Sequence, residues 1–209
     1  MEHIMKAIKF ILNLCLLFAA IFLGYSYITK QGIFQPKLHD SPDVNISNKA
    51  DINTSFSLIN QDGITISSKD FLGKHMLVLF GFSSCKTICP MELGLASTIL
   101  DQLGNEAGKL QVVFITIDPT KDTVETLKEF HKNFDSRIQM LTGNIEAINQ
   151  IVQGYKVYVG QPDNDNQINH SGIMYIVDKK GEYLAHFVPD LKSKEPQVDK
   201  LLSLIKQYL

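Results

Sequence analysis

Apolar and polar residues from Phe56 onward follow two periods, one typical of strands and one typical of helices. A continuous apolar run at residues 76–82 and the mostly apolar stretch at 110–117 predict two buried strands. Shorter apolar runs predict further strands at residues 56–59, 64–66, 138–141, 173–177 and 183–188. Apolar residues at helical spacing predict helices at residues 91–100, 123–134, 144–153 and 197–209, and a single helical turn at 68–72.

The order of these elements indicates the fold class. Strands alternate with helices, and a terminal hairpin and helix follow. This order favours an α/β fold with a mixed central sheet flanked by helices. Functional sites in open α/β sheets gather at the carboxyl ends of the strands, so we expect a site just after the strand at 76–82.

The first thirty residues have a different pattern. Residues 10–28 carry no charge and are about as long as a bilayer core requires, roughly 20 residues. They lack the small-x-small cleavage site of a signal peptide, so we predict an uncleaved N-terminal transmembrane helix. Lys6 and Lys9 precede this run and indicate a cytoplasmic N-terminus. We therefore expect a membrane anchor at 1–30, a flexible linker at 31–53, and a domain at 54–209 on the non-cytoplasmic side.

Overall charge restricts the partners. The 209 residues have a net charge of −2 and contain no basic run. A protein that binds nucleic acid through its phosphates needs a basic surface, so we expect no nucleic-acid partner.

Two cysteines, Cys85 and Cys89, follow the first buried strand in the stretch FGFSSCKTICP. A cysteine at a helix N-terminus is more readily a thiolate, the form that attacks disulfides or binds metals. A structural disulfide is a poor explanation, because so short a loop restrains the unfolded chain little. Cys15 lies in the apolar N-terminal run and reads as a small packing residue. The C-x-x-x-C spacing itself fits either a redox pair or a pair of metal ligands.

A histidine could provide a third ligand. His170 lies between the polar residues 161–169 and the strand at 173–177, where a ligand could be held. We expect His75 to be solvated in a turn, His131 to lie on a polar helix face, and His186 to be structural. Two thiolates and one imidazole form a soft set that suits Cu(I), or with a further ligand Cu(II) or Zn(II). A structural zinc site would need a fourth protein ligand, and the sequence does not indicate one.

Four segments in order resemble the Sco/SenC family of copper chaperones. They are the cysteine motif at 80–93, the DPTKDT segment within 114–123, the LTG element at 141–143, and the histidine segment at 170–181. The resemblance covers roughly residues 54–207. It implies a membrane-anchored, thioredoxin-like domain in which Cys85, Cys89 and His170 bind copper, as Cu(I) or Cu(II). Thr87 and Asn169 depart from the family, which often has Asp at both positions.

The function implied by this resemblance is delivery of copper to the binuclear copper centre of cytochrome c oxidase, with reduction of that centre's cysteines as a related role. The implied partners are the copper-receiving oxidase subunit and a copper donor or thiol reductant. The implied location is the inner membrane, with the domain on its periplasmic or equivalent side.

Two other functions remain open. A thiol-disulfide oxidoreductase without metal would not need His170, and would have a nucleophilic cysteine of lowered pKa, expected at Cys85. A peroxide-reducing relative would need an activating Thr or Arg beside its cysteine. The only arginine is Arg137, which is distant in sequence. Asp118 and Asp122 are expected to form a turn and a helix cap, with Asp122 or Thr123 opening the next helix.

Overall fold

The computed structural model describes residues 5–6, 17–18, 51–165, 167–190, 192–193 and 197–209. The chain divides into two compact units, Met1–Asp43 and Val44–Leu209. Most of the predicted membrane anchor and linker lies outside the described residues. Among the residues that are described, no helix is long and apolar enough to span a bilayer.

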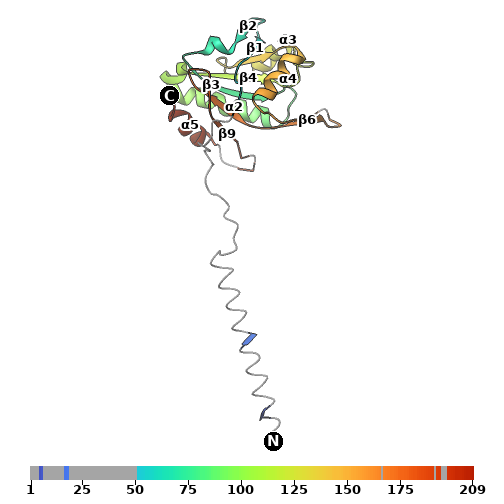
Figure 1. Ribbon diagram of the computed structural model, residues 1–209, viewed down its shortest axis with the longest axis vertical. Helices are drawn as coiled ribbons and strands as arrows, with labels where there is room; N and C mark the ends of the chain where they lie inside the picture. Colours follow the sequence, from blue (N-terminus) through green and yellow to red (C-terminus); the bar gives the residue numbers. More distant parts are fainter. Residues whose placement is uncertain (1–4, 7–16, 19–50, 166, 191, 194–196) are drawn as a thin grey trace. The chain divides into compact units, whose positions relative to one another are not determined.

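A seven-stranded mixed sheet forms the centre of the second unit, in the order β2-β1-β5-β4-β3-β8-β9 (Figure 1). Its two central strands are parallel and paired along their whole length, from His75 opposite Leu110 to Gly81 opposite Thr116. β5 runs parallel to β4, whereas β8 lies antiparallel to β3. The strands are β1 (Ser57–Asn60), β2 (Thr65–Ser67), β3 (His75–Gly81), β4 (Leu110–Thr116), β5 (Gln139–Thr142), β8 (Met174–Val177) and β9 (Tyr183–Phe187).

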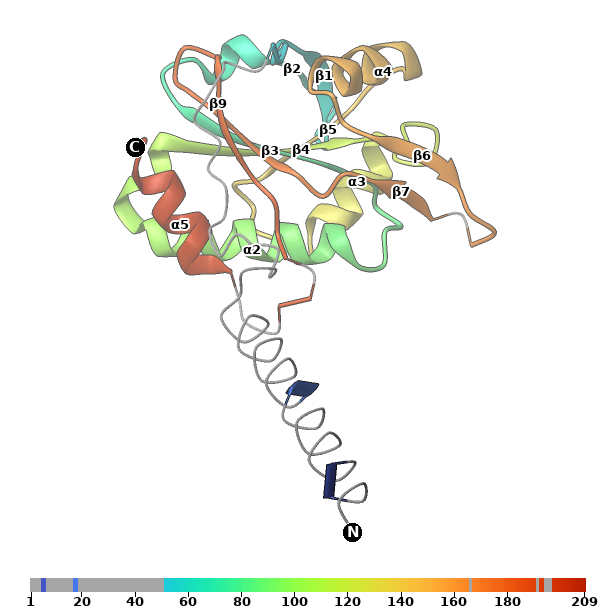
Figure 2. The ribbon, with the colours of Figure 1, turned by 60° about the horizontal axis from the view of Figure 1, so that its bottom comes forward.

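Helices cover both faces of this sheet, which confirms the predicted α/β architecture. α2 and α5 lie on one face and α4 on the other (Figure 2). Successive residues of β3 point to opposite faces: Leu79 packs in the cluster that contains α2, and Phe80 in the cluster that contains α4. Burial on both faces explains the continuous apolar run. The helices are η1 (Ser68–Phe71), α2 (Ile88–Leu103), η2 (Gly104–Lys109), α3 (Val124–His131), α4 (Ile145–Gly154) and α5 (Val198–Lys206).

A second, two-stranded sheet was not predicted. β6 (Val159–Pro162) and β7 (Ile168–His170) pair antiparallel where the sequence indicated a polar loop. His170 is therefore the last residue of a strand, not the end of a loop. The expectation for His75 was also wrong, because this residue begins β3 and is buried.

Candidate metal centre

The two cysteines lie at the carboxyl end of β3, as the sequence predicted. Cys85 is half-buried in the turn after the strand, and its N–H donates to the carbonyl of Phe82 at 3.1 Å. Cys89 is in the first turn of α2 and is fully buried. Its N–H points at the Cys85 sulfur, 3.5 Å away. The helix start thus brings the two thiols to one place.

Gly81, the last residue of β3, makes room for the buried thiol. A Cβ at this position would lie 2.4 Å from the Cys89 sulfur and 2.9 Å from the Phe114 ring. The backbone of Gly81 does not have a positive φ. Glycine is therefore needed here for close approach rather than for an unusual backbone conformation.

Asp122 anchors the start of the cysteine loop. Its carboxylate accepts hydrogen bonds from the N–H of Ser83 at 3.0 Å, from the Ser83 hydroxyl at 2.5 Å and from the Thr116 hydroxyl at 2.6 Å. Thr123, one of the two residues expected to open the next helix, caps α3, and its hydroxyl accepts from the N–H of Thr126. The buried carboxylate thus ties the segment before Cys85 to the end of β4.

His170 brings a nitrogen to the same place from β7. Its Nε2 lies 3.6 Å from the Cys89 sulfur. Its Nδ1 lies 3.1 Å from the carbonyl oxygen of Ser171, which can only accept, so Nδ1 carries the proton and donates. The ring also meets the edge of Phe82, with centroids 5.9 Å apart. This arrangement leaves the Nε2 lone pair free to bind an ion.

The donor atoms of Cys85, Cys89 and His170 all lie within 4.8 Å of one another. An ion with bonds of about 2.0–2.3 Å holds its ligand atoms roughly 4 Å apart, so the three atoms fit one ion. Within the described residues, this is the one cluster of three or more potential His, Cys, Asp or Glu ligands. A set of two sulfurs and one nitrogen is soft and suits copper better than magnesium or calcium.

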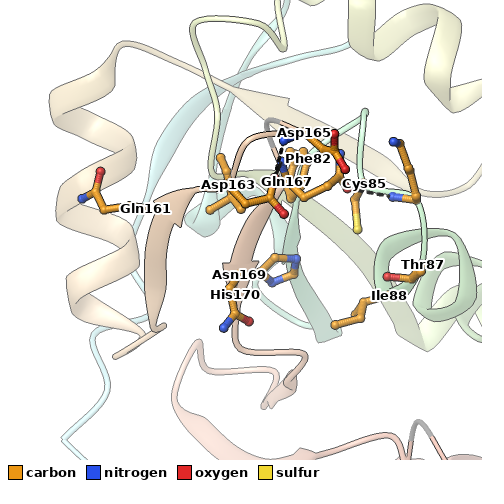
Figure 3. Close-up of a pocket in the computed structure, with 12 residues that line it drawn as sticks. Phe82, Cys85, Thr87, Ile88, Gln161, Asp163, Asp165, Gln167, Asn169 and His170 are labelled. Carbon is orange, nitrogen blue, oxygen red and sulfur yellow. Dashed lines mark hydrogen bonds between the residues drawn. The ribbon is translucent and has the colours of Figure 1, made fainter.

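A pocket of 360 Å³ opens beside the three donors. Cys85 and His170 line it from the cysteine loop and from β7, and Thr87 and Asn169 also border it (Figure 3). Cys89 does not border the pocket and is buried in the core. A bound ion would therefore have two ligands facing the pocket and one in the core, with an open side for an incoming ligand.

The pKa values of the two thiols move in opposite directions. The thiol of Cys89 donates to the Cys85 sulfur and lowers the pKa of Cys85, and the backbone N–H groups of Cys89 and Thr87 act the same way. That hydrogen bond and burial raise the pKa of Cys89. Cys85 is therefore the thiolate of the pair and the more reactive sulfur.

Glu92 is a buried carboxyl group close to the site. It lies one helical turn after Cys89 and is only 2% exposed. Its Oε1 has no hydrogen-bond partner. Burial, and then the negative charge of Cys85, raise its pKa to about 8. Glu92 is therefore neutral over most of the physiological range, which limits the negative charge beside the thiolate.

The other candidates lie outside this centre. The Nδ1 of His186 and the Tyr183 hydroxyl form a hydrogen bond of 2.6 Å, which fits the expected structural role of His186. Arg137 forms ion pairs with Asp101 and Asp135, so it does not provide the activating group of a peroxide-reducing enzyme.

Sequence reasoning did not identify Gly81, Glu92 and Asp122 as parts of the site. Glycine at the end of a buried strand and an acid inside an apolar helix face were the signals that could have revealed two of them.

Comparison with known proteins defines the class. The family model for SCO1/SenC matches residues 44–206. The chain is 40% identical over 152 residues to a SCO2-like protein of Rickettsia prowazekii (strain Madrid E), which covers 70% of this chain and 74% of that protein. It is 35% identical over 200 residues to a SCO2-like protein of Rickettsia typhi, covering 93% and 95% of the two chains. The chain therefore belongs to the SCO1/SenC family.

Solved structures agree with this assignment. Bradyrhizobium japonicum ScoI with copper bound superposes with a TM-score of 0.66 at 30% identity, over 76% of this chain and 99% of that one. Yeast Sco1 with copper bound gives a TM-score of 0.63 at 33% identity, over 74% and 88%. BsSco, described as having a disulfide switch and as belonging to the Sco family of cytochrome c oxidase assembly proteins, gives 0.62 at 25% identity, over 78% and 96%.

Proposed function

We propose that this protein binds copper through Cys85, Cys89 and His170 and delivers it to the binuclear copper centre of cytochrome c oxidase. The observation that carries the proposal is the meeting of three soft donor atoms within 4.8 Å beside an open pocket. Family membership and the copper-bound relatives support copper as the metal. The copper-receiving oxidase subunit is the proposed acceptor.

The proposed transfer is ligand exchange. When bound, copper accepts electron pairs from sulfur and nitrogen and readily changes its coordination. Cys85 and His170 face the pocket, so a thiolate of the acceptor can enter there before an existing bond breaks. Cys89 stays in the core throughout. A two-electron oxidant, such as a disulfide of another protein, would convert the Cys85 thiolate and the Cys89 thiol to a disulfide with release of one proton. Two ligands would be lost, so the redox state controls binding.

Copper binding by the reduced full chain, purified in detergent, tests this function. We expect one copper per chain. Loss of an outer partner of a metal ligand alone reduces affinity roughly 10–100-fold, so removing a ligand in His170→Ala should weaken binding by more than about 100-fold. His186→Ala is the matched control, because His186 lies on β9 and is bonded to Tyr183. A wild-type chain that binds no copper, or a His170→Ala variant of unchanged affinity, would refute the proposal.

Thiol-disulfide reduction is the second candidate function, and the opposite pKa shifts of the two cysteines favour it. The Cys85 thiolate would attack a disulfide and form a mixed disulfide. Cys89 would then lose its proton and attack Cys85, so that two electrons pass to the acceptor and the pair becomes oxidised. His170→Ala should spare this activity, whereas Cys85→Ser should abolish both activities.

The location is also a proposal. We infer that residues 10–28 anchor the chain in the inner membrane and that residues 31–53 tether the domain on its periplasmic or equivalent side. The lysines before the apolar run support this orientation, and cytochrome c oxidase assembly in relatives requires access to that membrane. A thiol reductant on the same side is needed to keep Cys85 and Cys89 reduced.

A further inference from the structure

One side chain, that of Gln167, joins the segment that carries His170 to the segment that carries Cys85. Its Nε2 donates to the carbonyl of Ser84 at 3.2 Å, and its Oε1 accepts from the N–H of Lys86 at 3.3 Å. These are the residues immediately before and after Cys85. The amide therefore holds the backbone on both sides of this cysteine, across more than 80 positions of sequence.

Gln167 is itself held firmly. Its N–H donates to Oδ1 of Asp163 at 2.8 Å, and its carbonyl accepts from the N–H of Asp163 at 2.9 Å. Three residues later, His170 pairs with Val159 in the β6–β7 hairpin. His170 and Gln167 are therefore held in one hairpin, so a shift of either residue moves the other.

The N–H of Cys85 donates to the carbonyl of Phe82, and the N–H of Cys89 points at the Cys85 sulfur. Beyond these contacts the cysteine loop has little support after Ser84. Asp122 fixes the loop at Ser83, before Cys85. After Cys85, Lys86 and Thr87 are exposed, and Thr87 precedes α2 without a side-chain capping bond. The two bonds from Gln167 thus supply support in the stretch where it is otherwise lacking.

We propose that Gln167 is the positioning residue that sets the separation between Cys85 and His170, and that its release loosens Cys85 before the other two ligands. Cys89 is fully buried against Gly81, and His170 is fixed by Ser171 and Phe82. Cys85 is half-buried and depends on the Gln167 amide. The proposal rests on the copper function above and adds an order to the transfer, with the Cys85 bond breaking first.

Gln167→Leu tests this, since it keeps the bulk of the side chain and removes both hydrogen bonds. Gln161→Leu is the matched control: Gln161 lies on β6 and lines the same pocket, but its side chain makes no hydrogen bond within the described part of the chain. The labelled Gln161 side chain in Figure 3 lies apart from Cys85. We expect both variants to unfold at nearly the same urea concentration.

Two measurements on the reduced, copper-free full chain come first. In Gln167→Leu, the Lys86 amide should exchange with solvent about tenfold faster, and Cys85 should react with iodoacetamide several-fold faster. Loss of these two exposed hydrogen bonds is expected to have effects of this size, since tenfold corresponds to about 1.4 kcal/mol. Cys89 should remain unreactive in both variants. These readouts do not depend on copper, so they remain informative if the proposed function fails.

The copper measurement is the rate of release to a chelator. We expect copper to leave Gln167→Leu about tenfold faster than Gln161→Leu, and the thiolate-to-Cu(II) absorption bands to shift in Gln167→Leu only. The proposal is overturned if the Lys86 amide and the Cys85 thiol behave alike in the two variants, or if copper leaves both at the same rate. A wild-type chain without copper binding would instead refute the proposed function and leave the first two tests standing.

Discussion

Replacing Gly81 by alanine tests whether close approach at the end of β3 positions the Cys89 sulfur. The new methyl carbon would lie 2.4 Å from that sulfur, and ordinary contacts begin at 3.4 Å. The sulfur would have to move by about 1 Å. It cannot do so freely, because Cys89 is fully buried and the Phe114 ring is also only 2.9 Å from the new carbon.

The size of the effect follows from these contacts. An extra carbon in a well-packed core costs about 1–3 kcal/mol. Alanine loses less conformational entropy on folding than glycine does, but this favours alanine by only roughly 0.5–1 kcal/mol. We therefore expect Gly81→Ala to lower the free energy of unfolding by about 1–2 kcal/mol. Metal–ligand distances tolerate only about 0.2 Å of error, so we expect its copper affinity to fall by at least about tenfold.

Gly94→Ala is the matched control. Gly94 is exposed within α2, and a Cβ there would meet nothing within 4 Å. Alanine should therefore stabilise the helix by about 0.5–1 kcal/mol and leave copper binding unchanged. Urea unfolding and competition with a copper chelator measure both quantities. The reasoning is refuted if Gly81→Ala is as stable as the wild type and binds copper with the same affinity.

Glu92→Gln should change how stability depends on pH. The folded pKa of about 8 lies above the ordinary value of 4.5, so between these pH values the folded state keeps the proton and the unfolded state loses it. The stability contributed by Glu92 is therefore full below pH 4.5 and falls as pH rises toward 8. From pH 4.5 to 7, the variant should gain about 3 kcal/mol relative to the wild type in urea unfolding, and a flat difference would contradict this account. Asp122→Ala should lower the free energy of unfolding by about 2–4 kcal/mol because it strands the N–H of Ser83 and two hydroxyls; a loss below 1 kcal/mol would show that the network contributes little.

Most of the sheet could be predicted from apolar periodicity, because strands buried on both faces admit few polar residues. The β6–β7 hairpin could not, since its strands are short and partly exposed and include Gly160 and Pro162. The polar sequence of this hairpin is typical of a loop, and only the pairing of His170 with Val159 in the structure shows that two strands are present. His75 was placed in a turn because Gly73 precedes it, whereas its neighbours in β3 and β4 bury it.

The three clustered residues were predicted, but their supports were not. Cys85 and Cys89 stand out by spacing at a strand end, and His170 was singled out by its position and by the family resemblance. Gln167, Glu92 and Asp122 are common polar residues whose role depends on distant partners. Tertiary contacts of this kind leave no local pattern, because the Gln167 side chain meets the cysteine loop only after the hairpin has formed.

The sulfur of Cys89 and the nitrogen of His170 are 81 positions apart in the sequence. An ion held by both is a cross-link that an unfolded chain cannot maintain, since closing so long a loop costs entropy. Copper at a hundred times its dissociation constant would therefore stabilise the folded chain by about 2.7 kcal/mol. Metal binding and folding are thus coupled: a chain that unfolds releases the ion, and a chain that holds the ion is folded.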